Sequence, residues 1–158
     1  PRALCNRTIL APTQDDGINK WLNKRLNRTE FMPFAPVTVD HQAKNMYANM
    51  DKIDYTSQFM TITTDCSAEM KKSSPAAVHV DGTARPQIVT EENNLRMHKV
   101  LNHYFELSGV PNLVNTSYNM HEEPIVCSPY DAIKAFSDGR LDYLVLEDYL
   151  VQQGDSEE

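Results

Sequence analysis

Cysteine is scarce in this sequence, and its three occurrences lie far apart. Cys5, Cys66 and Cys127 are an odd number of thiols without a closely spaced pair. This pattern argues against a disulfide framework and against a zinc site built from paired cysteines. We therefore expect reduced thiols that are mostly buried in the fold.

Long apolar runs and two well-known nucleotide-binding motifs are also absent. No stretch approaches the ~18 apolar residues that a membrane helix needs, and no signal peptide opens the chain. We therefore expect a cytoplasmic protein with no membrane partner. The sequence contains neither a GxxxxGK(S/T) loop nor a GxGxxG turn, so a bound nucleotide would have to be held by another arrangement.

Positive charge is limited and unevenly distributed. The chain has 15 lysine and arginine residues against 22 acidic residues, which gives a net charge of −7 at pH 7. Nucleic-acid binding normally requires a broad basic face, so we do not expect nucleic acid as a partner. Residues 1–28 are the exception, with a net charge of +4 from two acidic residues (Asp15 and Asp16) and six basic ones: Arg2, Arg7, Lys20, Lys24, Arg25 and Arg28. Such a compact basic segment in an acidic domain suits a small anionic ligand.

The composition and the order of the predicted elements are those of one globular domain. Apolar residues make up 41% of the 158 residues, enough for one core. Strands and helices interleave without a repeat, which predicts an α/β fold with a mixed β-sheet, because some connections are too short for helical crossovers. The predicted strands are 8–11, 58–64, 76–80, 86–89, 112–116 and 124–126, with an extended segment over 30–39 and a buried final strand over 141–151.

Helical periodicity and capping residues define the remaining elements. Trp21 falls on the apolar face of the first helix, so we expect it in the core. His98 and His103 lie five residues apart, which is not the spacing of a metal pair on a helix, and we interpret both as solvent-facing or structural. The predicted helices begin after Thr13 and after Asp40 and cover 93–108 and 128–139, while 65–74 is predicted to be a surface loop.

The stretch SPAAVHVDGTARPQIV, residues 74–89, carries an unusual number of polar groups at one bend. It predicts two short strands joined by a turn at Asp81, Gly82 and Thr83, with Arg85 beside the turn. The guanidinium group offers a fixed fork of donors that matches a phosphate or a carboxylate. A surface hairpin with a solvated arginine is an equal alternative from this stretch alone.

Several motifs together resemble one family. PRALCNRTILA, EFMPFAP, AVHVDGTARPQIV, GVPNLVNTSYN, EPIVCSPYDAIKAF and LDYLVL are similar to the C-terminal domain of NodU/CmcH-type O-carbamoyltransferases, from Pro1 to about Val151. The resemblance implies a YrdC-like α/β domain over 1–151, with a twisted mixed β-sheet flanked by helices. Residues 152–158 are then an acidic tail that we expect to be disordered. Because the chain opens inside a motif, we also expect a fragment of a longer protein.

The same resemblance implies an activity and its partners. In this family, the YrdC-like half uses carbamoyl phosphate and ATP, with Mg²⁺ entering as the ATP complex, to make carbamoyl adenylate. An N-terminal sugar-kinase-like half, which holds its own metal and is not in this chain, passes the carbamoyl group to an acceptor hydroxyl. This chain would thus be one part of a carbamoyltransferase, and the acceptor cannot be read from it. The alternative is a non-catalytic YrdC-like module, either RNA-binding or structural.

The resemblance also indicates site residues. Arg28 matches the arginine of a Lys-x-Arg pair and Ser117-Tyr118-Asn119 matches a Ser-x-Asn pair, both of which bind nucleotide phosphates and the acyl adenylate. Arg28, Arg85 and Ser117 are the expected catalytic residues, and no protein ligand for a metal is expected in this half. The expected nucleotide- or phosphate-binding residues are Arg2, Arg7, Thr83, Asn115, Thr116 and Asn119, with His79 and Lys24 as further candidates.

The chain departs from the family pattern at three places. The lysine of the Lys-x-Arg pair falls on Leu26 or Asn27, Cys5 stands where glycine is usual, and Met32 stands where an arginine is common. Two motif neighbours have simpler interpretations than a role in chemistry. His79 is more readily a satisfied strand histidine, and the group His121, Glu122 and Glu123 is more readily a solvated loop.

Overall fold

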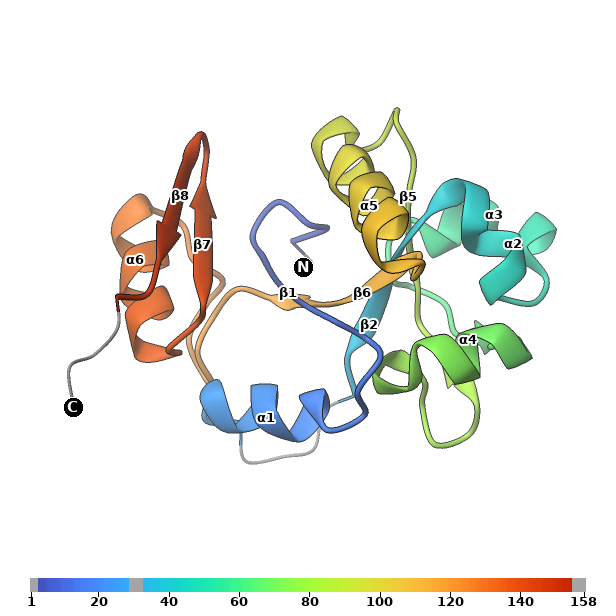
Figure 1. Cartoon of the computed structure of the whole chain (residues 1–158), viewed down its shortest axis with the longest axis horizontal. Coiled ribbons are helices and arrows are strands. Elements are labelled where there is room, and N and C mark those ends of the chain that lie inside the picture. Colours follow the sequence, from blue (N-terminus) through green and yellow to red (C-terminus); the bar gives the residue numbers. More distant parts are fainter. Residues whose placement is uncertain (1–2, 29–32, 155–158) are drawn as a thin grey trace.

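In the computed structural model, which describes residues 3–28 and 33–154, a four-stranded mixed sheet forms the centre of the fold (Figure 1). The strand order is β1-β6-β2-β5. Strands β1 (Thr8–Ala11) and β2 (Ala35–Val39) pair antiparallel with β6 (Asn112–Ser117), while β5 (Gln87–Val89) pairs parallel with β2. All residues of β2 and β5 are buried, as expected for apolar strands covered on both faces. The predicted α/β fold with a mixed sheet is confirmed.

The directions of the strands define two edges of the sheet. The Ser117 edge is where β6 ends and where β1, β2 and β5 begin: Thr8 is paired with Ser117 and Ala35 with Asn115. The Asp40 edge is opposite, where β2 ends at Val39 and runs directly into Asp40. Chemical groups at these two edges are therefore separated by the length of the strands.

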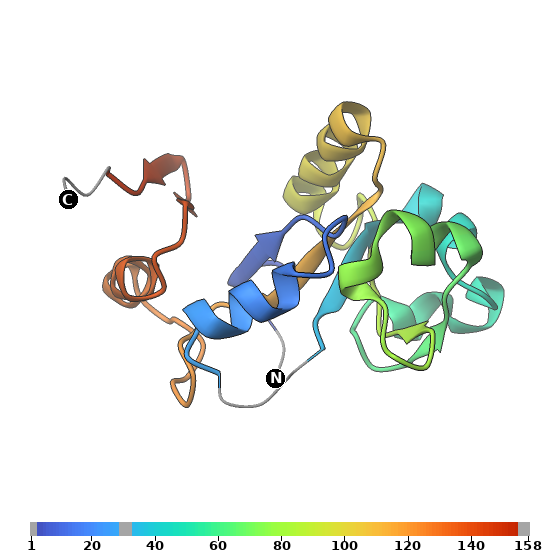
Figure 2. The same cartoon turned by 60° about the horizontal axis from the view of Figure 1, so that its bottom comes forward.

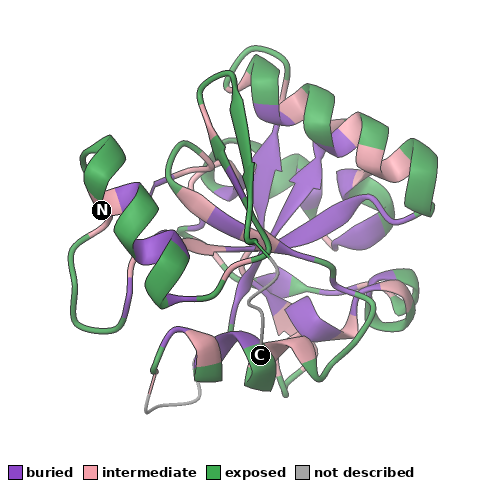
Figure 3. Cartoon of the chain, turned by 60° about the vertical axis from the view of Figure 1, so that its left-hand side comes forward, coloured by how far each residue is buried: buried purple, intermediate pink, exposed green. Residues whose placement is uncertain are grey.

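Helices cover the two faces of the sheet. Because side chains alternate along a strand, Leu113 and Val114 of β6 point to opposite faces. Leu113 belongs to the core beneath α5 (Leu95–Ser108), with Met97 and Leu101 of that helix. Val114 belongs to the core that includes α1 (Ile18–Arg25) and α6 (Pro129–Asp138). Figure 3 shows the buried strands between these helices.

A third core lies among the short elements between β2 and α5. After β2 come a 3₁₀ turn, η1 (Asp40–Gln42), and the helices α2 (Ala43–Met46), α3 (Met50–Ser57) and α4 (Ala68–Ser73). A second 3₁₀ turn, η2 (Pro75–Ala77), and a two-stranded ladder of β3 (Thr64–Asp65) and β4 (Thr83–Ala84) complete the group, which Figure 2 shows beside the sheet. Its buried centre includes Met46, Tyr47, Met70 and Ile88.

The C-terminal elements lie on the other side of the sheet from α2, α3 and α4 (Figure 1). Helix α6 is followed by an antiparallel hairpin of β7 (Tyr143–Leu146) and β8 (Tyr149–Gln152). Only Leu144 of the hairpin is buried. Within the described ranges, each helix is too short or too polar to cross a membrane.

Several predicted elements are confirmed. Strands are found at 8–11, within 86–89 and over the predicted 112–116, and the segment feeding a strand ends in β2. The helix predicted over 93–108 is α5, which Asn94 caps and Gly109 ends in the left-handed conformation. The helix predicted over 128–139 is α6, with Ser128 as its N-cap and Pro129 as its first residue.

Four strand or loop predictions are wrong in the middle of the chain. Residues 58–63 are a turn followed by irregular chain, and β3 starts only at Thr64. The predicted loop over 65–74 contains α4, which the Ser67 hydroxyl caps by accepting the Met70 N–H at 3.1 Å. The predicted strand 76–80 is instead η2 and a turn, because Pro75 fixes a turn-like backbone ahead of two alanines. Residues 124–126 form no strand, although the Val126 N–H donates to the Tyr118 carbonyl.

The predictions at three other elements also need correction. The buried final strand predicted over 141–151 is the exposed hairpin β7–β8, in which Glu147 turns the chain with a left-handed backbone. The helix predicted after Asp40 is broken at Tyr47, which is extended and bridges to Cys66, and α3 begins after Asn49, which is also left-handed. Thr13 does not cap α1; it is buried and its hydroxyl bonds Ser74 and Asn112, while Gly17 takes the N-cap.

Trp21 and one of the thiols lie nearer the surface than expected. Trp21 is 38% exposed, with the Arg25 guanidinium 4.1 Å from its ring centre, so it is not part of the core. The three cysteines are free, as expected. Cys66 is buried and Cys5 partly so, but Cys127 is exposed.

Candidate functional site

Arg28 reaches the Ser117 edge from the turn that follows α1. Asn27 has a left-handed backbone, and the Arg28 N–H donates to the Asn23 carbonyl at 2.9 Å, which turns the chain out of the helix. The Arg28 Nη2 donates to the Thr116 hydroxyl at 3.1 Å, and the guanidinium lies 5.3 Å from the Phe34 ring centre. The arginine is therefore held at the end of β6 by one neutral hydroxyl and one aromatic ring.

The Arg28 side chain is half-buried, and its contacts with the residues that the structure describes are to neutral groups. Burial lowers the pKa of the guanidinium, because desolvation disfavours its charged form. Among the residues that the structure describes, none offers a carboxylate within ion-pair distance of it. A partly desolvated cation whose described partners are a hydroxyl and an aromatic ring is suited to an anionic ligand.

Ser117 and Asn119 contact one another at the end of β6. The Ser117 hydroxyl donates to Asn119 Oδ1 at 2.6 Å, and the Asn119 amide donates to the carbonyls of Met120 and Glu123 at 2.8 and 3.0 Å. Tyr118 between them is buried, and its hydroxyl donates to the Ala132 carbonyl at 2.5 Å. The tyrosine thus anchors the loop to α6, while the two polar residues are only half-buried.

Asn115 belongs to a buried polar network beneath this edge. Its amide donates to Gln87 Oε1 at 2.7 Å, and the Cys5 thiol donates to the same oxygen at 3.3 Å. The Thr8 hydroxyl bonds both the Asn115 side chain and the Thr116 carbonyl. Asn115 is only 4% exposed, and its hydrogen bonds in this network join β6 to β1 and β5.

The other basic candidates differ in how well they are placed. Arg7 precedes β1 and donates from Nη1 to the Val126 carbonyl at 3.0 Å, which leaves its remaining donors at the exposed Ser117 edge. Lys24 is exposed on α1. Arg2 and Met32 lie outside the described residues.

The turn before β5 is closed by its own hydrogen bonds. Asp81 Oδ1 accepts from the Thr83 N–H and hydroxyl at 3.0 and 2.7 Å, and these bonds lower the pKa of the Asp81 carboxyl. His79 Nδ1 lies 3.1 Å from the same hydroxyl, and the His79 N–H donates to the Thr83 carbonyl. Thr83 and His79 are thus satisfied within a turn, and the adjacent carboxylate does not favour a phosphate contact there. Gly82, at φ 81°, provides the left-handed residue that the turn requires.

Arg85 leads from that turn to the Ser117 edge. It is half-buried and stands two residues before Gln87, the first residue of β5. Gln87 in turn holds Asn115 of β6. The topology therefore brings the segment that carries Arg85 to the same edge as Arg28 and Ser117.

Sequence reasoning missed three residues that shape the site. The Thr8 hydroxyl bonds both Asn115 and the Thr116 carbonyl, and Gln87 accepts from the Asn115 amide. The Phe34 ring packs against the Arg28 guanidinium. The signal for Gln87 was present, since an amide inside the apolar run PQIV needs a buried partner. His121, Glu122 and Glu123 are exposed, and Glu123 pairs with Lys134 at 3.3 Å, as a solvated loop would.

Comparisons with known proteins cover nearly the whole chain. A family model described as the carbamoyltransferase C-terminus matches residues 1–153. An uncharacterized protein from Methanocaldococcus jannaschii is 35% identical over 154 residues, which cover 97% of this chain and 25% of that protein. Nodulation protein NolNO from Sinorhizobium fredii is 37% identical over 157 residues, which cover 97% of this chain and 22% of that protein. The chain thus spans about a quarter of the length of these curated relatives.

A solved structure shares the fold. The crystal structure of full-length HypF in its phosphate- and nucleotide-bound form superposes with a TM-score of 0.55. The match has 19% sequence identity and covers 83% of this chain and 16% of the HypF chain. At this level of identity, the match shows that this chain and part of HypF share a fold.

Proposed function

The chain belongs to the carbamoyltransferase C-terminal family, and from this premise we propose that it binds ATP and carbamoyl phosphate and forms carbamoyl adenylate. In this reaction water would release phosphate from carbamoyl phosphate, and the resulting carbamate would displace pyrophosphate from the α-phosphorus of ATP. The family resemblance noted in the sequence is confirmed, whereas the reaction is our proposal. In the whole enzyme, the part that this chain does not include would pass the carbamoyl group to an acceptor hydroxyl.

One observation supports the proposal most strongly. Arg28 is a half-buried cation whose side chain contacts a neutral hydroxyl, Thr116, directly beside the Ser117–Asn119 pair. ATP and carbamoyl phosphate both carry negatively charged phosphate groups. A guanidinium fork and nearby hydroxyls can bind these groups through charge-assisted hydrogen bonds. The HypF structure of the same fold was determined with phosphate and nucleotide bound, which is consistent with this type of ligand.

The proposed roles follow from the placement of each group. Arg28 and Arg85 would neutralise phosphate oxygens at the Ser117 edge, while Ser117 and Asn119 would orient the adenylate through their polar side chains. Arg7, with donors left at its exposed guanidinium, would contribute further positive charge. Mg²⁺ would enter with ATP, coordinated mainly by phosphates and water. In reactions at a phosphate group, the protein contributes mainly by positioning the substrates and by stabilising the negative charge on the phosphate oxygens.

The test is calorimetric titration of the chain with ATP and with carbamoyl phosphate, each in the presence of Mg²⁺. We expect binding of both ligands, and we expect Arg28→Ala to weaken ATP binding by ~10-fold or more, since a charged hydrogen-bonding partner is lost. Arg96→Ala is the matched control, because Arg96 is an exposed arginine on α5 that pairs with Asp148 at 3.6 Å.

Two results would contradict the proposal. One is the absence of heat for either ligand, alone or together, with folded protein. The other is equal weakening by Arg28→Ala and Arg96→Ala, which would indicate a general effect of charge and not a site. Thermal unfolding of both variants should be measured first, so that loss of binding is not confused with loss of fold.

A further inference from the structure

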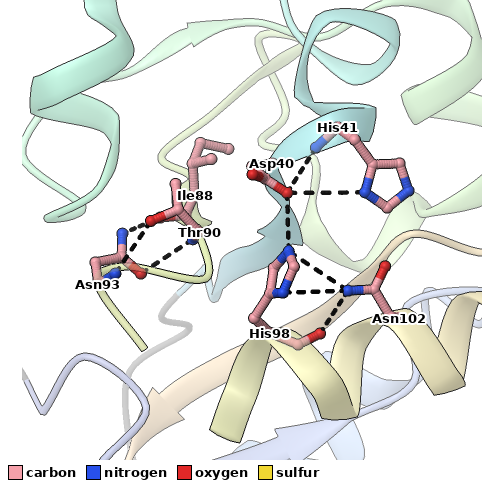
Figure 4. Close-up of polar contacts among 7 residues, drawn as sticks. All are labelled: Asp40, His41, Ile88, Thr90, Asn93, His98 and Asn102. Carbon is pink, nitrogen blue, oxygen red and sulfur yellow. Dashed lines mark hydrogen bonds and ion pairs between the residues drawn. The ribbon is translucent and has the colours of Figure 1, made fainter. Parts of the chain in front are cut away.

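Two histidines and one aspartate converge at the Asp40 edge. Asp40 is the first residue after β2, His41 follows it in η1, and His98 lies in the second turn of α5. His98 Nε2 is 3.1 Å and His41 Nδ1 is 3.7 Å from the same oxygen, Asp40 Oδ1. Figure 4 shows both imidazole rings directed at this oxygen from two separate elements.

The spacing of these atoms matches the first coordination shell of a small cation. One ligand atom from each of the three residues lies within 4.8 Å of the other two. Ions such as Zn²⁺ bind imidazole nitrogen and carboxylate oxygen at ~2.0–2.2 Å, so that adjacent ligand atoms of a tetrahedron lie ~3.3 Å apart. The 3.1 Å between His98 Nε2 and Asp40 Oδ1 is already close to this spacing, and His41 Nδ1, at 3.7 Å from the same oxygen, would move inward to share the ion.

The surroundings hold the three side chains in place. The Asp40 carboxylate accepts the His41 backbone N–H at 2.9 Å, which fixes it at the start of η1. The Asn102 amide, anchored to the His98 carbonyl at 2.9 Å, lies 3.4 Å from the ring nitrogens of His98. The His41 ring packs against the Phe105 ring with centroids 5.9 Å apart. These contacts restrict the movement of the three side chains before any ion binds.

The cluster is also accessible. The side chains of Asp40, His41 and His98 are 39%, 46% and 19% exposed, and Asp40 lines a cavity of about 380 Å³ together with Lys44, Asp51 and Asp54. An ion could therefore enter from solvent, and a water molecule could complete its shell. Because the cluster lies at the Asp40 edge, it is separate from the proposed phosphate site.

We propose that Asp40, His41 and His98 bind one divalent transition-metal ion of the Zn²⁺ type, with solvent in the open position. The ion would join the end of β2 to α5 and leave one coordination position free for an oxygen ligand. The donor set selects the class of metal: imidazole nitrogen suits Zn²⁺, Co²⁺ or Ni²⁺, whereas Mg²⁺ prefers oxygen ligands. This site is thus distinct in chemistry from the Mg²⁺ that accompanies ATP.

The test is titration of the metal-free chain with Zn²⁺ by calorimetry and with Co²⁺ by visible absorption. We expect one ion per chain, Co²⁺ bands of a nitrogen- and oxygen-ligated ion, and a rise in the melting temperature with Zn²⁺, because an ion that binds the native state stabilises it. Mg²⁺ should produce none of these effects.

Variants locate the ion. We expect His98→Ala and His41→Ala each to weaken Zn²⁺ binding by at least ~10-fold. Loss of a residue that only supports a metal ligand already lowers metal affinity by about that factor, and loss of the ligand itself should lower it at least as much. His41 is exposed, so its replacement leaves the fold intact even if His98→Ala does not. His103→Ala is the matched control: it lies on the same helix, is exposed, and pairs with Glu106 at 3.1 Å. Absence of Zn²⁺ binding, or unchanged binding in His41→Ala, or equal loss in His103→Ala, would overturn the proposal.

Discussion

Cys5 combines a left-handed backbone with a largely buried thiol. Its φ of 69° lies in the region that favours glycine, the residue that the family resemblance led us to expect at this position. The Cys5 thiol donates to Gln87 Oε1, the same oxygen that accepts from the Asn115 amide. The cysteine that stands in place of the expected glycine is therefore part of the polar network beneath the Ser117 edge.

Burial of thiols and phenols makes the fold sensitive to alkaline pH. Burial raises the pKa of Cys5 to about 12 and that of Cys66 to about 11. It also raises the pKa of Tyr118 to about 12 and that of Tyr47 beyond it. At a pH where these thiols and phenols begin to ionise in the unfolded chain, they are still neutral in the folded state. The folded state therefore loses stability as the pH rises above the unfolded values, ~8.5 for cysteine and ~10 for tyrosine.

We expect the melting temperature of the chain to fall steadily from pH ~8.5 to pH ~10.5. Thermal unfolding followed by circular dichroism in a series of buffers measures it. Cys5→Ala should reduce the steepness of the fall, because it removes one of the ionising groups. A melting temperature that stays constant or rises over this interval would contradict the assignment of these groups as buried and neutral.

At the scale of elements, α6 shows how strongly a short sequence signal can define a helix. The Ser128 hydroxyl accepts the Asp131 N–H at 3.2 Å, and the Asp131 carboxylate accepts the Ser128 N–H at 2.9 Å, forming a capping box. Hydrogen bonding by Ser128 and by the Cys127 N–H lowers the pKa of the Asp131 carboxyl. Helix α6 carries Ala132, whose carbonyl anchors Tyr118 next to Ser117. The cap thus supports the loop that bears the Ser-x-Asn pair.

We expect Ser128→Ala to lower the free energy of unfolding by about 1 kcal/mol, the usual cost of losing a serine cap. Denaturant unfolding of the wild type and the variant measures the difference. Ser137→Ala, at an exposed position near the end of the same helix, should change stability by only a few tenths of a kcal/mol. If both substitutions cost the same, the cap does not contribute as described.

The elements that sequence reasoning identified share clear boundary signals. Helices α5 and α6 each have a capping residue at the start and apolar residues that repeat along one helical face. Helix α5 is also ended by Gly109. Helix α4 was missed because only Met70 of its six residues is buried, so no periodicity is visible. The final hairpin was read as one strand because Glu147 makes its turn without glycine or asparagine. Here the backbone conformation is fixed by pairing between strands and not by local preference.

At the scale of the whole molecule, function depends on which strand ends meet. Arg28 and Ser117 are far apart in sequence, yet the antiparallel pairing of β6 with β1 and β2 places both at the Ser117 edge. No local pattern gives a strand order of β1-β6-β2-β5, so only the family resemblance suggested these residues as one site. The same pairing places Asp40 and His98 at the opposite edge, although spacing along one helix had argued against a metal role for His98.

The two edges can be distinguished in one experiment, a ¹H–¹⁵N chemical-shift titration of the chain with Mg²⁺ and ATP. We expect the largest shifts at the amides of Arg28, Thr116 to Asn119 and the start of β5, with little change at Asp40, His41 and His98. Shifts confined to the Asp40 edge, or no shifts at saturating ATP, would contradict the account that the Ser117 edge is the nucleotide site.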